Sequence, residues 1–213
     1  MQALFNPDGP LFSFGEQLFN IMAVSILWVI CCIPIVTIGP ATCALYYVAV
    51  KQIRKNNGSL LHNFFSSFRD SLRSGIPLTC IVLIYATAMV AAIWAAENGS
   101  LGTTGGYLSY AAKALLLALL LVLPYLAPVI SRFSMGVGAI LKLSIVMSLR
   151  FLWRTILLLA LIAGSAFLLW ITPYFFIALP GVCALVSSFL IEPVLLKYIP
   201  KPDANQPIPW YWG

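Results

Sequence analysis

Charged residues are scarce in this sequence, and long stretches contain none. Asp, Glu, Lys and Arg make up 8% of the 213 residues, while 62% are hydrophobic; soluble domains carry roughly 25% charge. Four intervals lack any charged residue: 17–50, 74–96, 114–131 and 155–191. Each is close to or longer than the roughly 17 to 25 residues that cross a bilayer. The composition therefore excludes a soluble globular domain and predicts a multi-pass protein of the cell membrane.

Residues that support catalysis or metal binding are also few. His62 is the only histidine, and the six acidic residues lie near the ends of the apolar intervals or in the tails. Glu192, beside Pro193, has the position of an interfacial acid. The sequence contains no nucleophile elbow, phosphate-binding loop or zinc-protease motif. We therefore expect a protein that is not an enzyme and that needs no metal or cofactor.

The apolar intervals predict an all-α, polytopic helix bundle with about five transmembrane helices. Interval 155–191 would be about 55 Å long as one helix, which exceeds a hydrocarbon core of about 30 Å. A turn is expected at Thr172-Pro173, because a residue before proline disfavours the helical conformation. The predicted spans are 17–37, 74–96, 107–130, 152–172 and 174–195.

Basic residues gather after the first, third and fifth predicted spans, in the regions 51–73, 132–154 and 197–201. The remaining connections and residues 1–16 contain no Lys or Arg. Cytoplasmic loops carry the excess of Lys and Arg. This pattern predicts that the N-terminus is outside and the C-terminus inside.

Interfacial helices are predicted on the cytoplasmic side. In 59–73, Leu60, Phe64 and Phe68 share one helical face while polar residues occupy the others, which is typical of a helix lying in the membrane interface. Further interfacial helices are expected over 41–55 and 138–150, followed at the end of the chain by a Pro-rich, non-helical tail, 199–213.

Four arginines recur at one spacing. A shift of 81 residues places Arg69 on Arg150 and Arg73 on Arg154, with apolar residues matching around them. Two interpretations stay open: a weak internal duplication, or two independent helices whose basic ends follow membrane topology and bind anionic headgroups. In either case the four arginines are candidates for contacts with a partner or with the bend described next.

One apolar segment is interrupted twice, at Pro34 and at Gly39-Pro40. Residues 17–50 are too long for one transmembrane span and too short for two comfortable spans with a loop. They therefore form either one span followed by an interfacial helix or a hairpin of two spans. The charge pattern favours the first arrangement, with a bend at the inner membrane face. The candidate residues for this bend are Pro34, Thr37, Gly39, Pro40 and Tyr46, the last in an interfacial aromatic belt.

The segments that carry these features resemble the YesL family of small bacterial membrane proteins, a domain of unknown function. The most specific match is "PIVTIGPATCALYY" (34–47), which follows the family pattern at Pro34, Thr37, Gly39, Pro40 and Tyr46. The resemblance implies a Gram-positive bacterial plasma membrane. It also implies an association with carbohydrate transport, because genes of this family often lie beside carbohydrate ABC importers.

The function expected from this resemblance is that of a non-enzymatic accessory subunit of an oligosaccharide ABC importer. It would pack against the permease subunits and support assembly or transport. The alternatives are a stand-alone transporter of a small solute and a membrane sensor of carbohydrate status. The expected partners are membrane lipids and permease subunits, without nucleic acid, and no direct sugar site is identifiable.

Overall fold

The computed structural model describes residues 10–54, 59–98, 102–133 and 135–198. Every regular element in these residues is helical, which confirms the all-α prediction. In chain order the elements are α1 (Pro10–Cys31), η2 (Ile35–Thr37), α2 (Ile38–Val48), η3 (Ala49–Arg54), α3 (Leu60–Asn98), α4 (Gly102–Arg132), α5 (Val137–Arg150), α6 (Leu152–Ile171), η4 (Pro173–Ile177) and α7 (Leu179–Leu195).

Local backbone chemistry ends several of these helices. Pro34 has extended dihedral angles and precedes the short 3₁₀ turn η2. Thr172 is also non-helical, with ψ of 90°, before Pro173 opens η4; both breaks follow the steric restriction that proline places on its neighbours. Phe151, with φ of −121° and ψ of 46°, separates α5 from α6. The chain therefore turns at Pro34, Phe151 and Thr172.

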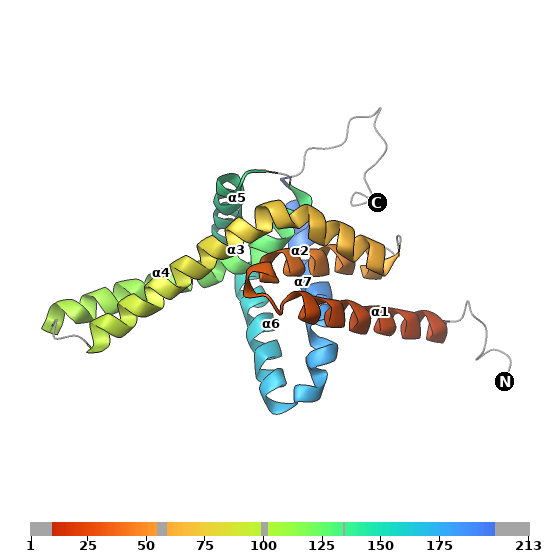
Figure 1. Ribbon diagram of the computed structural model, residues 1–213, viewed down its shortest axis with the longest axis horizontal. Coiled ribbons are helices and arrows are strands. Elements are labelled where there is room, and N and C mark those ends of the chain that lie inside the picture. The colour runs from red at the N-terminus through yellow and green to blue at the C-terminus, as the bar shows by residue number, and fades with distance from the viewer. Residues whose placement is uncertain (1–9, 55–58, 99–101, 134, 199–213) are drawn as a thin grey trace.

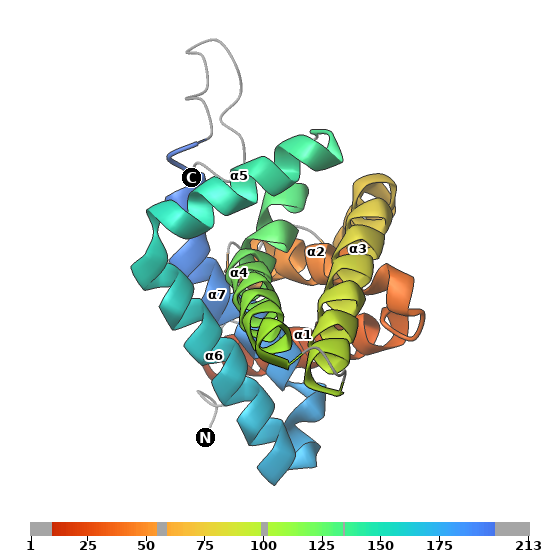
Figure 2. The same cartoon turned by 90° about the vertical axis from the view of Figure 1, so that its left-hand side faces the viewer.

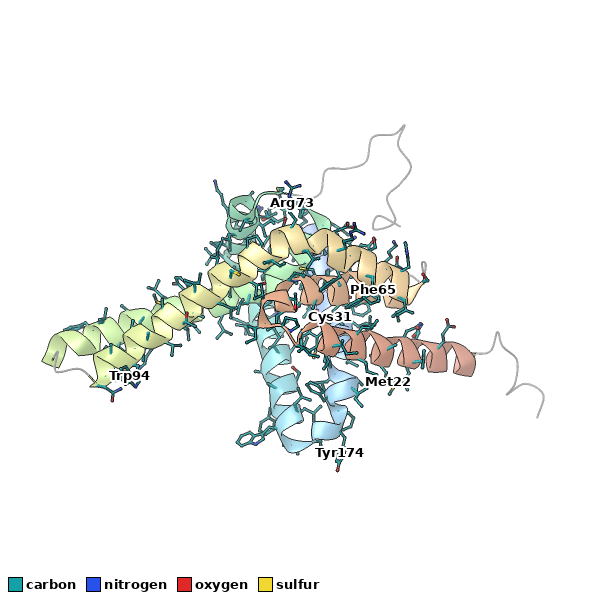
Figure 3. All side chains as sticks on the ribbon, viewed as in Figure 1. Met22, Cys31, Phe65, Arg73, Trp94 and Tyr174 are labelled. Carbon is teal, nitrogen blue, oxygen red and sulfur yellow. The ribbon has the colours of Figure 1, made fainter. Side chains whose placement is uncertain are left out.

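The helices form arms that meet at a common centre (Figure 1). The outer half of α3 and helix α4 run side by side as one arm, which Figure 2 shows end-on. Helices α6 and α7 form a second arm, and α1 extends away from the first. Trp94 and Tyr174 mark the far ends of the two paired arms (Figure 3).

Two apolar clusters hold the centre together. The larger one draws buried side chains from α2, η3, α3, α4, α5, α6 and α7, and includes Tyr125, Ile140 and Leu158. The smaller one joins α1, α2, α3 and α7 around Phe64, which is fully buried. Interior packing of this kind fixes the positions of helices that are far apart in sequence.

Among the residues that the structure describes, three helices are long and apolar enough to cross a membrane: Leu60–Asn98, Gly105–Arg132 and Leu152–Ile171. Three shorter apolar helices accompany them, over Gly15–Cys31, Ile35–Lys51 and Leu179–Leu195. The lengths and compositions indicate a membrane protein.

Helix α3 differs from the two helices expected in its place. The predicted interfacial helix 59–73 and the predicted span 74–96 are one continuous helix of 39 residues. No helix-breaking sequence separates them, and Pro77 lies inside the helix. Figure 1 shows α3 bending in its middle part, and an internal proline bends a helix without ending it when the turns on both sides are packed.

Helix α2 is buried between other helices. Ala41, Cys43 and Ala44 are fully buried and Tyr46 is 3% exposed, so the segment predicted as an interfacial helix over 41–55 is enclosed by other helices as far as Val50. Small side chains at these positions allow neighbouring helices to approach closely. Lys55 and the predicted tail 199–213 lie outside the described residues.

Candidate functional site

The bend between α1 and α2 is closed by one threonine. The Thr37 hydroxyl lies 2.6 Å from the Cys31 carbonyl oxygen and 2.7 Å from that of Pro34, and donates its hydrogen to them. The Thr37 backbone N–H also donates to the Pro34 carbonyl, at 3.0 Å. These bonds satisfy carbonyl groups that the interruption of α1 removes from the helical pattern, and they tie the end of α1 to the turn.

Gly39 and Pro40 place the bend directly against α3. A Cβ atom on Gly39 would overlap the Thr79 hydroxyl and lie 3.1 Å from the Gly75 carbonyl oxygen. A Cβ atom on Gly75 would lie 2.8 Å from Pro40 Cγ. The two glycines therefore permit a close crossing of α2 and α3 that larger residues would prevent.

The outer side of the bend is apolar and uncovered. Ile33 is 77% exposed and Ile35 is 61% exposed. Val36 and Ile38 are also exposed. Figure 3 places Cys31 where α1 ends and the turn begins. The bend thus combines a backbone fixed on its inner side with apolar side chains presented on its outer side.

A buried polar cluster joins three helices in the centre. Arg132, the last residue of α4, donates to Glu192 Oε1 of α7 at 2.5 Å, and the two side chains are 3% and 6% exposed. The Tyr46 hydroxyl of α2 donates to the same carboxylate oxygen at 3.3 Å. Glu192 is therefore a buried ion-pair partner, and Tyr46 is buried between helices and not exposed.

The four predicted arginines occupy different surroundings. Arg69 and Arg73 are exposed on α3. The Arg150 guanidinium lies 3.4 Å from the Tyr198 hydroxyl and over its ring. That of Arg154 lies 3.4 Å from the Leu190 carbonyl. The residues paired by the 81-residue shift therefore have different surroundings. Their helices also differ, because Arg69 and Arg73 lie on the continuous helix α3, whereas Arg150 and Arg154 lie on the separate helices α5 and α6.

A polar pocket of about 680 Å³ lies between the middle of α3 and the α4–α5 connection. Two arginines, Arg73 and Arg132, line it together with Asp70. The remaining polar lining consists of Tyr47 and the serines Ser66, Ser67, Ser71, Ser74 and Ser131. Its apolar lining is Ile130, Phe133, Met135 and Val137. Figure 3 shows Arg73 on the side of the molecule where α5 lies.

Neither the buried cluster nor the pocket was predicted from the sequence. Arg132 and Glu192 are 60 residues apart, so only the packing of α4 against α7 reveals their pairing. The pocket had a local signal: Ser67, Ser71 and Ser74 recur at helical spacing on one face of α3. Because the predicted interfacial helix ended at Arg73, this face was interpreted as its polar side.

In the part of the chain that the structure describes, no group of three or more His, Cys, Asp or Glu residues is placed to bind a metal ion. The cysteines of this part are free thiols. The assignments as a protein that is not an enzyme and has no cofactor remain predictions.

Comparison with known proteins gives one result. No curated protein and no solved structure matches the chain. Residues 21–94, which contain the second half of α1, the bend, α2 and most of α3, match the model of a family described as "Protein of unknown function, DUF624". The part of the chain that carries the bend is therefore similar to a domain family whose function is unknown.

Proposed function

We propose that this protein is a non-enzymatic accessory subunit of a carbohydrate ABC importer, and that its bend docks against the permease subunits. The observation that carries this proposal is the geometry of the bend. Thr37 and the Gly39–Thr79 contact fix its inner side, while Ile33 and Ile35 project outward. A surface that is already ordered loses little conformational entropy on binding.

The exposed side chains of the bend support a protein partner. Residues 32–34 are not helical, and they connect two apolar helices. Ile33 and Ile35 beside this interruption are large apolar side chains that are mostly exposed, and burying apolar surface against a partner is favourable. A partner helix lying across the bend would cover this region and bury Ile33 and Ile35 with it.

The choice of an oligosaccharide importer as partner follows from the resemblance to the YesL family, whose genes accompany such importers. The bend lies inside the matched residues 21–94. The proposed topology has five spans with the N-terminus outside and the C-terminus inside. In this arrangement the bend, Arg69, Arg73 and Arg150 lie near the cytoplasmic face.

Site-specific photocrosslinking tests the docking surface. A photoreactive phenylalanine analogue at Ile35, introduced in cells that express the importer, should form an adduct with a permease subunit. The matched control is the same analogue at Trp170, which is 84% exposed but lies on α6. Adducts are identified by mass spectrometry after purification through a tag on this chain.

The proposal predicts a permease adduct from Ile35 and none, or far less, from Trp170. Equal adducts from both positions would show that the bend is not a selective contact. If neither Ile33 nor Ile35 captures an importer component, the accessory-subunit proposal fails.

A stand-alone transporter is the second candidate, and the buried cluster favours it. Ionisable residues inside membrane proteins often mark solute or ion pathways, and the Arg132–Glu192 pair lies beside a polar pocket. Purified protein in liposomes should then move a solute without any other subunit. A flux that the Glu192→Gln variant abolishes would favour this function over the accessory role.

A further inference from the structure

We propose that the pocket between α3 and the α4–α5 connection binds the phosphate group of a small phosphate ester. The alcohol part of the ester carries a hydroxyl or an amine, and the ester is either a phospholipid headgroup or a soluble metabolite. This assignment is independent of the docking function proposed above. It follows from the charges, hydroxyl groups and helix terminus that line the pocket.

Two arginines provide the charge. A guanidinium presents N–H donors in a planar fork that matches phosphate oxygens. Arg132 is held in place by Glu192, which pairs with it. Arg73 is exposed and forms no ion pair with any residue that the structure describes. Because Glu192 offsets the charge of Arg132, the positive charge offered to a phosphate comes from Arg73, which lines the pocket together with Asp70.

Hydroxyl groups and a helix terminus add donors. Five serines line the pocket. The Ser131 hydroxyl already donates to the Pro128 carbonyl oxygen at 2.8 Å, and the other four serines lie on α3, where Ser67 and Ser71 are 8% and 5% exposed. Helix α5 begins at the pocket with Gly136 as its N-cap, and no side chain caps it. Nothing lies within 4 Å of the position that a Cβ on Gly136 would occupy, so a phosphate can approach the first amide groups, which favour anions.

Asp70 limits the class of ester. It lies one turn before Arg73 and Ser74 on α3 and lines the same pocket. A carboxylate repels a bare phosphate but accepts hydrogen bonds from a hydroxyl or an ammonium group. A ligand with phosphate at Arg73 and such a group at Asp70 satisfies both charges. Phosphoethanolamine and glycerol phosphate have this chemistry, both as free molecules and as lipid headgroups.

The apolar lining is compatible with the lipid source. Ile130, Phe133 and Val137 line the pocket together with the polar groups, so one wall suits the carbon atoms of an ester. The volume of about 680 Å³ lies within the roughly 300 to 1,000 Å³ that small-molecule sites occupy. Lipid and soluble esters share the phosphate chemistry, and the experiment below separates them.

Binding is measured on the full chain in an uncharged detergent by isothermal titration calorimetry. The soluble arm uses phosphoethanolamine and glycerol phosphate, and the lipid arm uses short-chain phosphatidylethanolamine and phosphatidylglycerol. Glycerol and an equal concentration of sodium chloride are the ligand controls. Saturable binding in the soluble arm supports the proposal and assigns a soluble ester, while binding in the lipid arm alone supports it and assigns a headgroup.

The matched variants are Arg73→Gln and Arg69→Gln, which remove exposed arginines one turn apart on α3. Only Arg73 lines the pocket. Loss of a charge-assisted contact should weaken binding about tenfold in Arg73→Gln and leave Arg69→Gln unchanged. Thermal unfolding without ligand checks that both variants are folded. Asp70→Asn provides a second test, because it should weaken the binding of phosphoethanolamine and should not weaken the binding of inorganic phosphate, which the carboxylate repels.

Three results would overturn the proposal. The first is the absence of binding in both arms by the unmodified protein. The second is an equal loss in Arg69→Gln and Arg73→Gln, which would indicate diffuse attraction of anions to a basic surface. The third is equal binding of glycerol, which would show that the phosphate is not what the pocket recognises.

Discussion

Arg132 and Glu192 form an ion pair at 2.5 Å while both side chains are almost completely buried. The pair joins the end of α4 to α7, and the Tyr46 hydroxyl of α2 donates to the same carboxylate. Removing one partner of a buried pair leaves the other charge without compensation, and this costs far more than the pair itself contributes. The cluster therefore fixes the relative positions of three helices.

The first prediction concerns this pair. Arg132→Met should lower the free energy of unfolding by about 3 to 5 kcal/mol, because it leaves the Glu192 carboxylate buried without its cation. Unfolding of the detergent-solubilised protein by denaturant measures the change. The double variant Arg132→Met with Glu192→Leu should recover a large part of the loss.

The control is the exposed pair of Lys113 and Glu97, which are 2.7 Å apart with both side chains about half exposed. Lys113→Met should change stability by no more than about 1 kcal/mol. A similar effect for Arg132→Met and Lys113→Met would contradict the role given to burial.

The second prediction concerns the crossing of α2 and α3. Gly39→Ala should destabilise the protein by about 1 to 3 kcal/mol, because the added methyl group overlaps the Thr79 hydroxyl and forces the helices apart. Gly164→Ala is the matched control, since its Cβ would meet nothing within 4 Å. Thermal unfolding compares the two. The close contact would be refuted if both variants were as stable as the unmodified protein.

The third prediction tests the closure of the bend. Thr37→Val keeps the shape of the side chain but removes the donor to the Cys31 and Pro34 carbonyls, and should cost about 1 to 2 kcal/mol of stability. It should also reduce the crosslinking yield at Ile35 by disordering the turn. Thr87→Val is the comparison, because exposed Thr87 bonds only to carbonyls of its own helix. Equal effects of the two substitutions would speak against a special role of Thr37.

The fourth prediction concerns orientation in the membrane. Basic residues 51–73 and 132–154 are expected inside, and Glu97 outside. A fluorescent protein fused after Tyr198 should therefore be fluorescent in the cytoplasm, and a fusion to a periplasmic or extracellular reporter after Asn98 should be active. The opposite pattern would reverse the proposed topology and move the pocket to the outer face.

The sequence allowed the helical class and the membrane character to be predicted, because both depend on local composition. Intervals without charged residues identify apolar helices, and this identification does not depend on how the helices pack against one another. Pro34 and Thr172-Pro173 also mark real interruptions, since the restriction by proline acts on its own neighbours. Gly39 and Pro40 were selected as part of a bend, but their contact with Gly75 and Thr79 depends on the position of α3.

Two features were not predicted from the sequence, and both depend on remote contacts. Residues 59–73 have the amphipathic pattern of an interfacial helix, and the structure shows that polar residues of this segment line a pocket and that the helix continues through Pro77. Glu192 lies at the end of an apolar interval, and its pairing with Arg132 depends on the packing of α4 against α7. In both cases the contacting residues are remote in the sequence. The local sequence does not show whether a charged or polar side chain is hydrated or is paired with another residue in the interior.

About two and a half turns of α3, residues 71–79, contribute to two different contacts. Ser71 and Ser74 line the pocket, while Gly75 and Thr79 support the bend at Pro40 and Gly39. Ser74 and Gly75 are adjacent on a continuous helix, so one short stretch of α3 forms part of the pocket wall and part of the surface on which the bend rests. We therefore expect a substitution within residues 71–79 to affect both the pocket and the bend.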